Sequence, residues 1–284
     1  MLSRGMPVYF RPTRTEEALE RLAAAPLTVL AGGTDHYPAR VGRPLAEDIL
    51  DITALDALRG IQETAQGWRI GATTSWMQII EAKLPPLFDA LKLAAREVGG
   101  AQIQNSGTVA GNLCNASPAA DGVPPLLSLD ASVELASVAG TRMLKLEEFI
   151  LGPRRTARRA DELLAAIRIP KPRAAAHSHF LKLGARRYLV ISIVMVAAAI
   201  ESERGKVTTV RVAVGACGPV ARRLPALEAA LIGAPVAADL GSRVRAAHFA
   251  PLEAIDDARG SAAYRNEAAQ VLVQRCLDEL GAAA

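Results

Sequence analysis

The sequence predicts an α+β protein built from two small α/β units and a C-terminal antiparallel sheet with helices. Short apolar runs of strand length alternate with segments whose apolar residues recur at helical spacing. Near the C-terminus, two long alternating runs flank a short turn at residues 203–205, which predicts an antiparallel hairpin. With 284 residues, 50% of them hydrophobic and 22% charged, the chain is long enough for more than one core and too apolar to be disordered.

The first unit is expected to span residues 1–55. Thr15 is the expected N-cap of a helix that Pro26 ends. The apolar runs at residues 27–31 and 49–52 predict two short strands. If these strands are parallel, a helix that connects them makes a right-handed crossover.

The second unit is expected to span residues 56–173. Thr74 or Ser75 caps its first helix, and the glycine pair at 99–100 ends the helix that follows. Its strands are expected at residues 68–72, 132–136, 142–146 and 162–169.

The third unit is expected to span residues 174–284. The runs at residues 193–201 and 206–216 predict paired strands, and residues 261–280 predict a final helix whose apolar stripe covers the sheet. The most apolar run, residues 189–200, is too short to cross a bilayer, so we expect no membrane span.

The charges and cysteines exclude several classes of function. With 33 basic and 29 acidic residues the net charge is +4, too small and too dispersed to indicate nucleic-acid binding. The densest basic run, residues 154–159, is expected to be a solvated loop, with an acidic partner subunit or a nucleotide phosphate as alternatives. The three cysteines lack iron–sulfur spacing, and the absence of an apolar leader in residues 1–11 favours a reducing cytoplasm.

Catalytic and metal-ligating patterns are not recognisable in the sequence. No Ser–His–Asp order, zinc-binding helix or paired-carboxylate motif stands out. His177 and His179 would lie on one face of a strand, but no third ligand is near them in the sequence, so we expect no metal site. The chemistry is therefore expected to come from a cofactor.

A polar stretch rich in small residues, 102–121, is the most informative part of the chain. Gly107 and Gly111 either allow a ligand to approach the backbone closely or adopt a positive φ. Ser117 followed by Pro118 predicts a helix start, whose free N–H groups would suit a phosphate. The alternative is a long capped surface loop.

A second stretch of similar character follows the strand at residues 27–31. It consists of Gly32, Gly33, Thr34 and Asp35. Successive backbone N–H groups in such a turn form a concave nest that suits a pyrophosphate. The pattern is neither a Walker loop nor a dinucleotide glycine fingerprint, and taken alone it is also typical of an ordinary turn.

Four motifs occur in order along the chain. They are Ala-Gly-Gly-Thr-Asp at 31–35, Ile-Gly-Ala-Thr-Thr at 70–74, Asn-Ser-Gly-Thr-Val-Ala-Gly-Asn at 105–112 and Asn-Ala-Ser-Pro-Ala-Ala-Asp at 115–121. In this order they resemble the FAD-binding medium subunits of the molybdenum hydroxylases, which include xanthine dehydrogenase, carbon monoxide dehydrogenase, aldehyde oxidoreductase and 4-hydroxybenzoyl-CoA reductase. The resemblance covers essentially the whole chain and implies the vanillyl-alcohol-oxidase-like (PCMH-type) FAD-binding fold.

The resemblance also implies which residues hold FAD. The pyrophosphate loop would be Val29, Leu30, Ala31, Gly32, Gly33, Thr34, Asp35 and His36. The phosphates, ribityl chain or adenosine part would be contacted by Thr108, Val109, Ala110, Gly111, Asn112, Asn115, Ser117 and Asp121. Positions against the cofactor or its flavin ring would be taken by Val98, Ile103, Leu164, Lys182 and Tyr188.

Several of these residues have a structural alternative. Val98 and Ile103 also suit helix-end packing, Leu164 suits the core, and Lys182 suits a strand-edge charge. No Cys or His matches a covalent flavin anchor, so dissociable FAD is expected.

The resemblance implies an electron-relay role rather than a catalytic residue in this chain. A large subunit with molybdopterin would act on the substrate, and a small subunit with two [2Fe-2S] clusters would deliver electrons to FAD. FAD would then reduce NAD+, dioxygen or a quinone. Two alternatives remain at this point: a free-standing flavin oxidase of the same fold, and an assembly protein that has lost FAD. The corresponding subunit of 4-hydroxybenzoyl-CoA reductase carries an extra iron–sulfur cluster on an insertion. This sequence lacks that insertion, so we expect no cluster in this chain.

Overall fold

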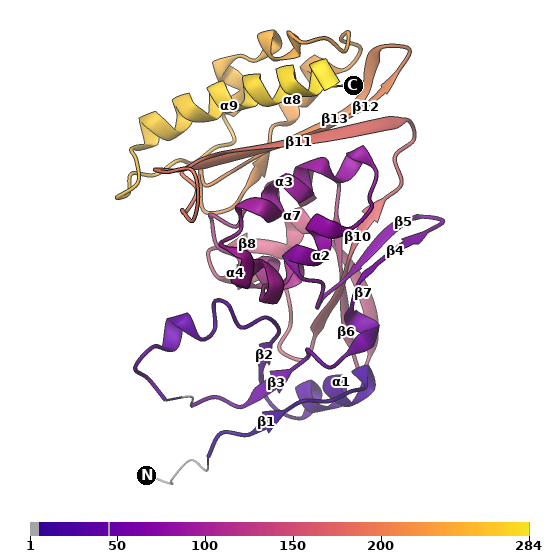
Figure 1. Cartoon of the computed structure of the whole chain (residues 1–284), viewed down its shortest axis with the longest axis vertical. Helices are drawn as coiled ribbons and strands as arrows, with labels where there is room; N and C mark the ends of the chain where they lie inside the picture. Colours follow the sequence, from indigo (N-terminus) through magenta and orange to yellow (C-terminus); the bar gives the residue numbers. More distant parts are fainter. Residues whose placement is uncertain (1–5, 45, 284) are drawn as a thin grey trace.

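A computed structural model describes residues 6–44 and 46–283 and arranges them around three main sheets that follow one another along the long axis of the molecule (Figure 1). The N-terminal and C-terminal units lie at opposite ends, and the middle unit separates them. In the part of the chain described, no helix combines the length and the apolar character that crossing a membrane requires.

The N-terminal sheet has three parallel strands in the order β1-β3-β2. Its elements are β1 (Tyr9–Phe10), α1 (Thr15–Ala24), β2 (Thr28–Leu30) and β3 (Ile49–Asp51), with η1 (Pro38–Arg40) between the last two strands. Both predicted strands are confirmed, and they are parallel. Thr15 is the first helical residue rather than the N-cap, because the extended residue before it is Arg14, whose side chain makes no capping hydrogen bond.

The middle sheet is antiparallel, in the order β4-β5-β10-β6-β7. Its strands are β4 (Ile61–Thr64), β5 (Gly67–Gly71), β6 (Ser132–Ser137), β7 (Gly140–Lys145) and β10 (Leu163–Pro170). The four predicted strands are confirmed, whereas β4 was not predicted. Its central residues, Gln62 and Glu63, are both exposed, so it lacks the apolar alternation of a half-buried strand.

Short helices surround this sheet. They are η2 (Asp56–Leu58), α2 (Trp76–Glu81), η3 (Pro86–Phe88), α3 (Asp89–Glu97), α4 (Ala101–Ser106), α5 (Val109–Asn115), α6 (Val123–Ser128) and α7 (Leu146–Phe149), followed by the ribbon β8 (Ile150–Gly152) and β9 (Arg155–Thr156). Ser75 caps α2 through a reciprocal capping box with Gln78, as its residue type predicts. Gly99 has φ +57° directly after the last residue of α3 and its cap, which confirms it as a helix stop.

The predicted helix start at Ser117 and Pro118 is wrong. The Ser117 hydroxyl accepts a hydrogen bond from Ala119 N at 3.3 Å within a turn, and Pro118 O accepts one from Ala216 N at 3.1 Å. The next helix, α6, begins only at Val123, with prolines at its first positions. The stretch 102–121 is also not one long loop, because it contains most of α4 and all of α5.

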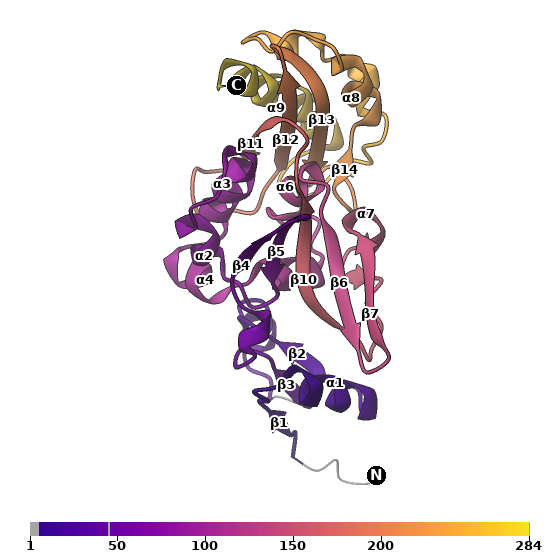
Figure 2. The same ribbon diagram turned by 90° about the vertical axis from the view of Figure 1, so that its right-hand side faces the viewer.

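The C-terminal sheet, in the order β11-β12-β13-β14, is antiparallel and has a helical cover on both faces (Figure 2). Its elements are β11 (Ala175–Leu183), β12 (Val194–Glu203), β13 (Lys206–Gly215), β14 (Arg222–Arg223), α8 (Pro225–Leu231), η4 (Leu240–Arg243), η5 (Ala246–Phe249) and α9 (Ala262–Ala283). The α9 stripe, including Val273 and Cys276, is buried against one face as predicted. On the other face Phe180 and Ala197 pack against α3, which joins this sheet to the middle unit.

Candidate functional site

The two polar stretches singled out in the sequence lie directly against each other. A β-carbon placed on Gly32 would lie 1.9 Å from the carbonyl oxygen of Ser106, so only glycine permits this approach. A β-carbon on Gly107 would lie 3.3 Å from Thr34 Oγ1. The turn after β2, residues 31–36, therefore meets the junction between α4 and α5.

The turn at residues 31–36 presents a run of free backbone donors. Gly33 has φ +68°, and Tyr37 N closes the turn by donating to Gly33 O at 3.1 Å. Among the residues described, the N–H groups of residues 32–36 find no protein acceptor. Residues 32–34 and 36 are half-buried and Asp35 is exposed, so these N–H groups are available to an anionic ligand.

His36 ends this turn in a largely buried position. Its Nε2 atom has no hydrogen-bond partner within residues 6–44 and 46–283. Burial lowers the pKa of His36 first, and the nearby Arg40 guanidinium lowers it further, while Glu47 opposes them. The imidazole is therefore neutral at neutral pH, and it adds a polar atom to the site without adding a charge.

The junction between α4 and α5 is held by a backbone bridge and by a helix cap. Trp76 N donates to Gly107 O and Val109 N donates to Thr74 O, both at 3.1 Å. Thr108 caps α5 by accepting a hydrogen bond from Gly111 N at 3.0 Å. Gly111 is thus an ordinary helical residue. Neither Gly111 nor Gly107, which has φ −65°, has the positive φ that the sequence allowed, whereas Gly33 has.

The side chains of α5 divide between the core and the junction. The side chains of Val109 and Ala110 are buried in the hydrophobic core, so only their backbone is available to a ligand. Asn112 Oδ1 is buried and has no partner among the described residues. At the end of the helix, Asn115 Nδ2 donates to Asp35 Oδ2 at 2.6 Å and joins the two stretches directly.

A buried ion pair lies on the opposite flank of this junction. Lys182 Nζ, from β11, is 2.7 Å from Asp121 Oδ2, and Ser192 Oγ donates to Asp121 Oδ1 at 2.5 Å. Burial raises the pKa of Asp121, and the Lys182 ammonium opposes that rise. Lys182 Nζ also contacts Glu97 O at 3.4 Å, so Lys182 is a buried partner of Asp121 and not a strand-edge charge.

The remaining predicted residues lie around the α3–α4 turn or in the core. Val98 is the C-cap of α3 and is half-buried, and Ile103 is 36% exposed on α4. Tyr188 is 62% exposed on the loop after β11, and its neighbour Leu189 approaches Gly100. Leu164 is buried in the same core as α5, as its structural alternative predicted.

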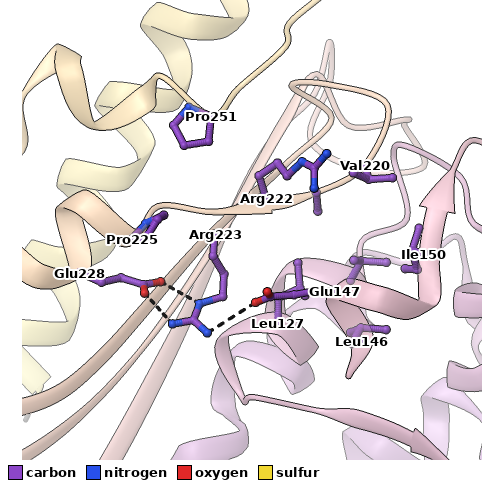
Figure 3. Close-up of a pocket in the computed structure, with 12 residues that line it drawn as sticks. Leu127, Leu146, Glu147, Ile150, Val220, Arg222, Arg223, Pro225, Glu228 and Pro251 are labelled. Atoms are coloured by element: carbon purple, nitrogen blue, oxygen red, sulfur yellow. Dashed lines mark hydrogen bonds and ion pairs between the residues drawn. The ribbon is translucent and has the colours of Figure 1, made fainter. Parts of the chain in front are cut away.

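A separate pocket of about 340 Å³ lies between the middle and C-terminal units (Figure 3). Its centre is Arg223, which bonds Glu228 at 2.9 and 2.5 Å and Glu147 at 3.5 Å. The guanidinium is thus already satisfied by the protein's own carboxylates. None of the predicted site residues lines this pocket, so it is not the candidate site.

The arrangement at the junction can hold an anionic, elongated ligand. It offers free N–H donors at one end, an unpaired amide oxygen on α5, and exposed apolar surface at Ile103 and Tyr188. The predicted residues come together on both sides of α4 and α5. Ser192 and Trp76 contact this region but belong to no motif, so the sequence carries no signal for them. Arg154 was indicated only as one member of the basic run at 154–159.

Two family models match the chain and together cover most of it. Residues 3–172 match a model described as the FAD binding domain in molybdopterin dehydrogenase. Residues 179–280 match the CO dehydrogenase flavoprotein C-terminal domain.

Similar proteins span nearly the same length. The nicotinate dehydrogenase FAD-subunit of Eubacterium barkeri is 36% identical over 80% of both chains, and the putative xanthine dehydrogenase FAD-binding subunit of Escherichia coli is 30% identical over 97% of this chain and 96% of that protein. Among solved structures, carbon monoxide dehydrogenase of Hydrogenophaga pseudoflava matches with a TM-score of 0.86 and 28% identity over 97% of each chain. That of Oligotropha carboxidovorans has a TM-score of 0.89 and 25% identity over 100% of each chain. These neighbours confirm the predicted fold.

We expect the ion pair between Asp121 and Lys182 to be strongly coupled, because removing either partner leaves the other charge buried. Lys182→Met and Asp121→Asn should each lower the free energy of unfolding by roughly 3–5 kcal/mol, and the double variant should lose less than their sum. Urea unfolding of the four proteins measures this. Lys171→Met is the control, because its pair with Glu63 is exposed and should contribute less than about 1 kcal/mol. Additive losses would contradict the coupling.

Proposed function

Because the chain belongs to the family of FAD-binding domains in molybdopterin dehydrogenases, we propose that it relays electrons from partner-held [2Fe-2S] clusters through FAD to NAD+, dioxygen or a quinone. The chain is the FAD-binding subunit of an oxidoreductase of the xanthine dehydrogenase family. The observation that carries the proposal is the direct contact between the turn at residues 31–36 and the α4–α5 junction, with its unpaired polar atoms.

The unpaired atoms suit different parts of FAD in chemical kind. We assign the pyrophosphate to the free N–H groups of residues 32–36, as diphosphates favour successive backbone donors. Asn112 Oδ1 would accept a hydrogen bond from a ribityl or ribose hydroxyl. The flavin ring is assigned to the flank with Val98, Ile103, Lys182 and Tyr188.

Bound FAD supplies the redox chemistry, and the protein binds and orients it. Asp121 is occupied by Lys182 and Ser192, so its proposed part is to hold β11 and the loop before β12 beside the ring. Leu164, Val109 and Ala110 support α5 from the core.

The proposal includes three structural units and two partner subunits. Residues 1–55, 56–173 and 174–284 are the proposed units, which agrees with one main sheet lying inside each range. The partners are a molybdopterin-binding large subunit and a small subunit with [2Fe-2S] clusters, because relatives that match over nearly their whole length are FAD-binding subunits or medium chains. Cys114, Cys217 and Cys276 are free thiols, which supports a location in the cytoplasm.

Gly33→Ala should weaken FAD binding by roughly tenfold or more, because the residue has φ +68° and its new β-carbon would lie 2.7 Å from the Tyr37 ring. The added methyl group would displace the turn that carries the free donors. Flavin fluorescence titration of the purified chain measures the dissociation constant.

Gly42→Ala is the matched control for this prediction. Gly42 has φ +75° in the same segment, but a β-carbon there meets nothing within 4 Å, so the variant shares the backbone strain without the crowding. Equal FAD affinities in the two variants would show that the turn does not bind the cofactor. Flavin that remains with acid-precipitated protein would contradict dissociable FAD.

Affinity purification of the tagged chain from its native cell should recover two further proteins, with iron and molybdenum in the eluate. The isolated chain should oxidise no heterocycle or aldehyde, because the proposal assigns the substrate to the molybdopterin-binding large subunit. Metal analysis and steady-state assays of both preparations measure this. Turnover of an organic substrate by the chain alone would favour a free-standing oxidase instead.

A further inference from the structure

We propose that Arg154 supplies the cation that pairs with the cofactor's diphosphate, which makes it a binding residue outside both polar stretches. The proposal deepens the FAD-binding function above and rests on it. The observations that carry it are the backbone conformation of Arg154, the position of its guanidinium group and the charge of the turn that it faces.

The backbone of Arg154 is in a conformation that an arginine rarely adopts. Gly152 pairs with Arg155, so Pro153 and Arg154 form the two-residue connection between β8 and β9. Arg154 has φ +59°, and a proline followed by a residue with positive φ is the pattern of a turn that favours glycine or asparagine at the second position. Because the turn itself would favour glycine, we infer that the presence of arginine at this position reflects a role of its side chain.

Two contacts fix where the Arg154 side chain lies. The backbone N of Arg154 donates to Ala116 O at 2.9 Å, which ties the turn to the end of α5. From there the guanidinium donates to Asn115 Oδ1 and lies 3.7 Å from Asp35 Oδ1. Arg154 therefore reaches both polar stretches at the point where Asn115 and Asp35 join them.

The charge at this point is unfavourable for a diphosphate without Arg154. The free N–H groups of residues 32–36 favour an anion, but the Asp35 carboxylate lies within the same turn and repels it. Arg40, the other cation in contact with this turn, donates to His36 O and pairs with Glu47. Arg154 offsets the Asp35 charge and provides planar donors that suit phosphate oxygens.

Within the part of the chain described, the hydrogen bonds of Arg158 and Arg159 are made around Glu162 and not to Asp35 or Asn115. Arg158 Nη1 donates to Glu162 O at 2.6 Å, and Arg159 N donates to the carboxylate of the same glutamate at 2.7 Å. Arg155 is exposed, and no ion pair to it is present among the described residues. For the basic run at 154–159, the sequence allowed a solvated loop, an acidic partner subunit or a nucleotide phosphate. These contacts favour the nucleotide phosphate for Arg154 alone. The Arg154 side chain is 63% exposed, so it is free to turn from Asp35 onto a bound phosphate.

Arg154→Gly separates a binding role from a structural one, because the two roles predict opposite effects on the apoprotein. Glycine relieves the strain at φ +59°, so the thermal midpoint of the apoprotein should stay the same or rise. The dissociation constant for FAD should increase roughly 10- to 100-fold through loss of a charge-assisted hydrogen bond. Arg155→Ala, one residue away, should change neither quantity.

Salt provides an independent readout of the same assignment. Sodium chloride should weaken FAD binding to the parent chain more steeply than to Arg154→Gly, because the variant has lost a cation–phosphate pair that salt screens. Arg154→Lys should fall between the two in affinity.

The outcomes distinguish this assignment from the function on which it rests. Equal FAD affinities for Arg154→Gly and Arg155→Ala would overturn the assignment and leave FAD binding intact. A fall in both FAD affinity and apoprotein stability, with an unchanged salt dependence, would also overturn it, by showing a structural role. Failure of the parent chain to bind FAD would overturn both.

Discussion

The approach of Gly32 to the carbonyl of Ser106 is the contact on which the candidate site depends. A side chain at this position would lie inside the van der Waals radius of that oxygen, since the β-carbon would come within 1.9 Å. The close approach brings the donors of the N-terminal unit beside α5 of the middle unit. Neither stretch alone offers both free N–H groups and an unpaired amide oxygen, so the site exists only because the two units meet here.

The rest of the molecule keeps this contact in place. The backbone bridge between Ser75 and Thr108 fixes the junction to α2, while the core behind α5 holds it against β10. On the other flank, the buried pair of Lys182 and Asp121 attaches the C-terminal sheet to the same segment. Buried charges and unpaired donors lower the stability of an ordinary core. Here they are concentrated around the junction between the 31–36 turn and α5, as is usual for a preorganised binding site.

Much of the fold could be predicted from the sequence because local patterns carry it. The strands β2, β3, β5, β6, β10, β12 and β13 and the helix α9 follow from apolar runs, alternation and helical spacing. The hairpin strand β4 could not be predicted in this way, because its register with β5 is fixed by a turn and not by burial. Ser117 was misread because a serine before proline suits both a helix start and a turn, and only the tertiary contact of Pro118 with Ala216 decides between them.

The site was predictable in its motifs but not in its long-range partners. Asp121 and Lys182 were each expected near a cofactor, yet their contact with each other joins residues 61 positions apart. Arg154 contacts Asn115 across 39 positions and Asp35 across a still larger separation, and its basic run gave no signal of which arginine would turn inward. Such contacts depend on how whole units pack, which no local pattern encodes.

Hydrogen exchange of the apoprotein with and without added FAD tests most directly whether the site is assembled between the first two units. FAD should slow exchange at the amides of residues 32–36 and at the start of α5, where donors are free or only capped, and should leave the central strands β12 and β13 unchanged. Protection confined to the C-terminal sheet, or none at residues 32–36, would contradict the account.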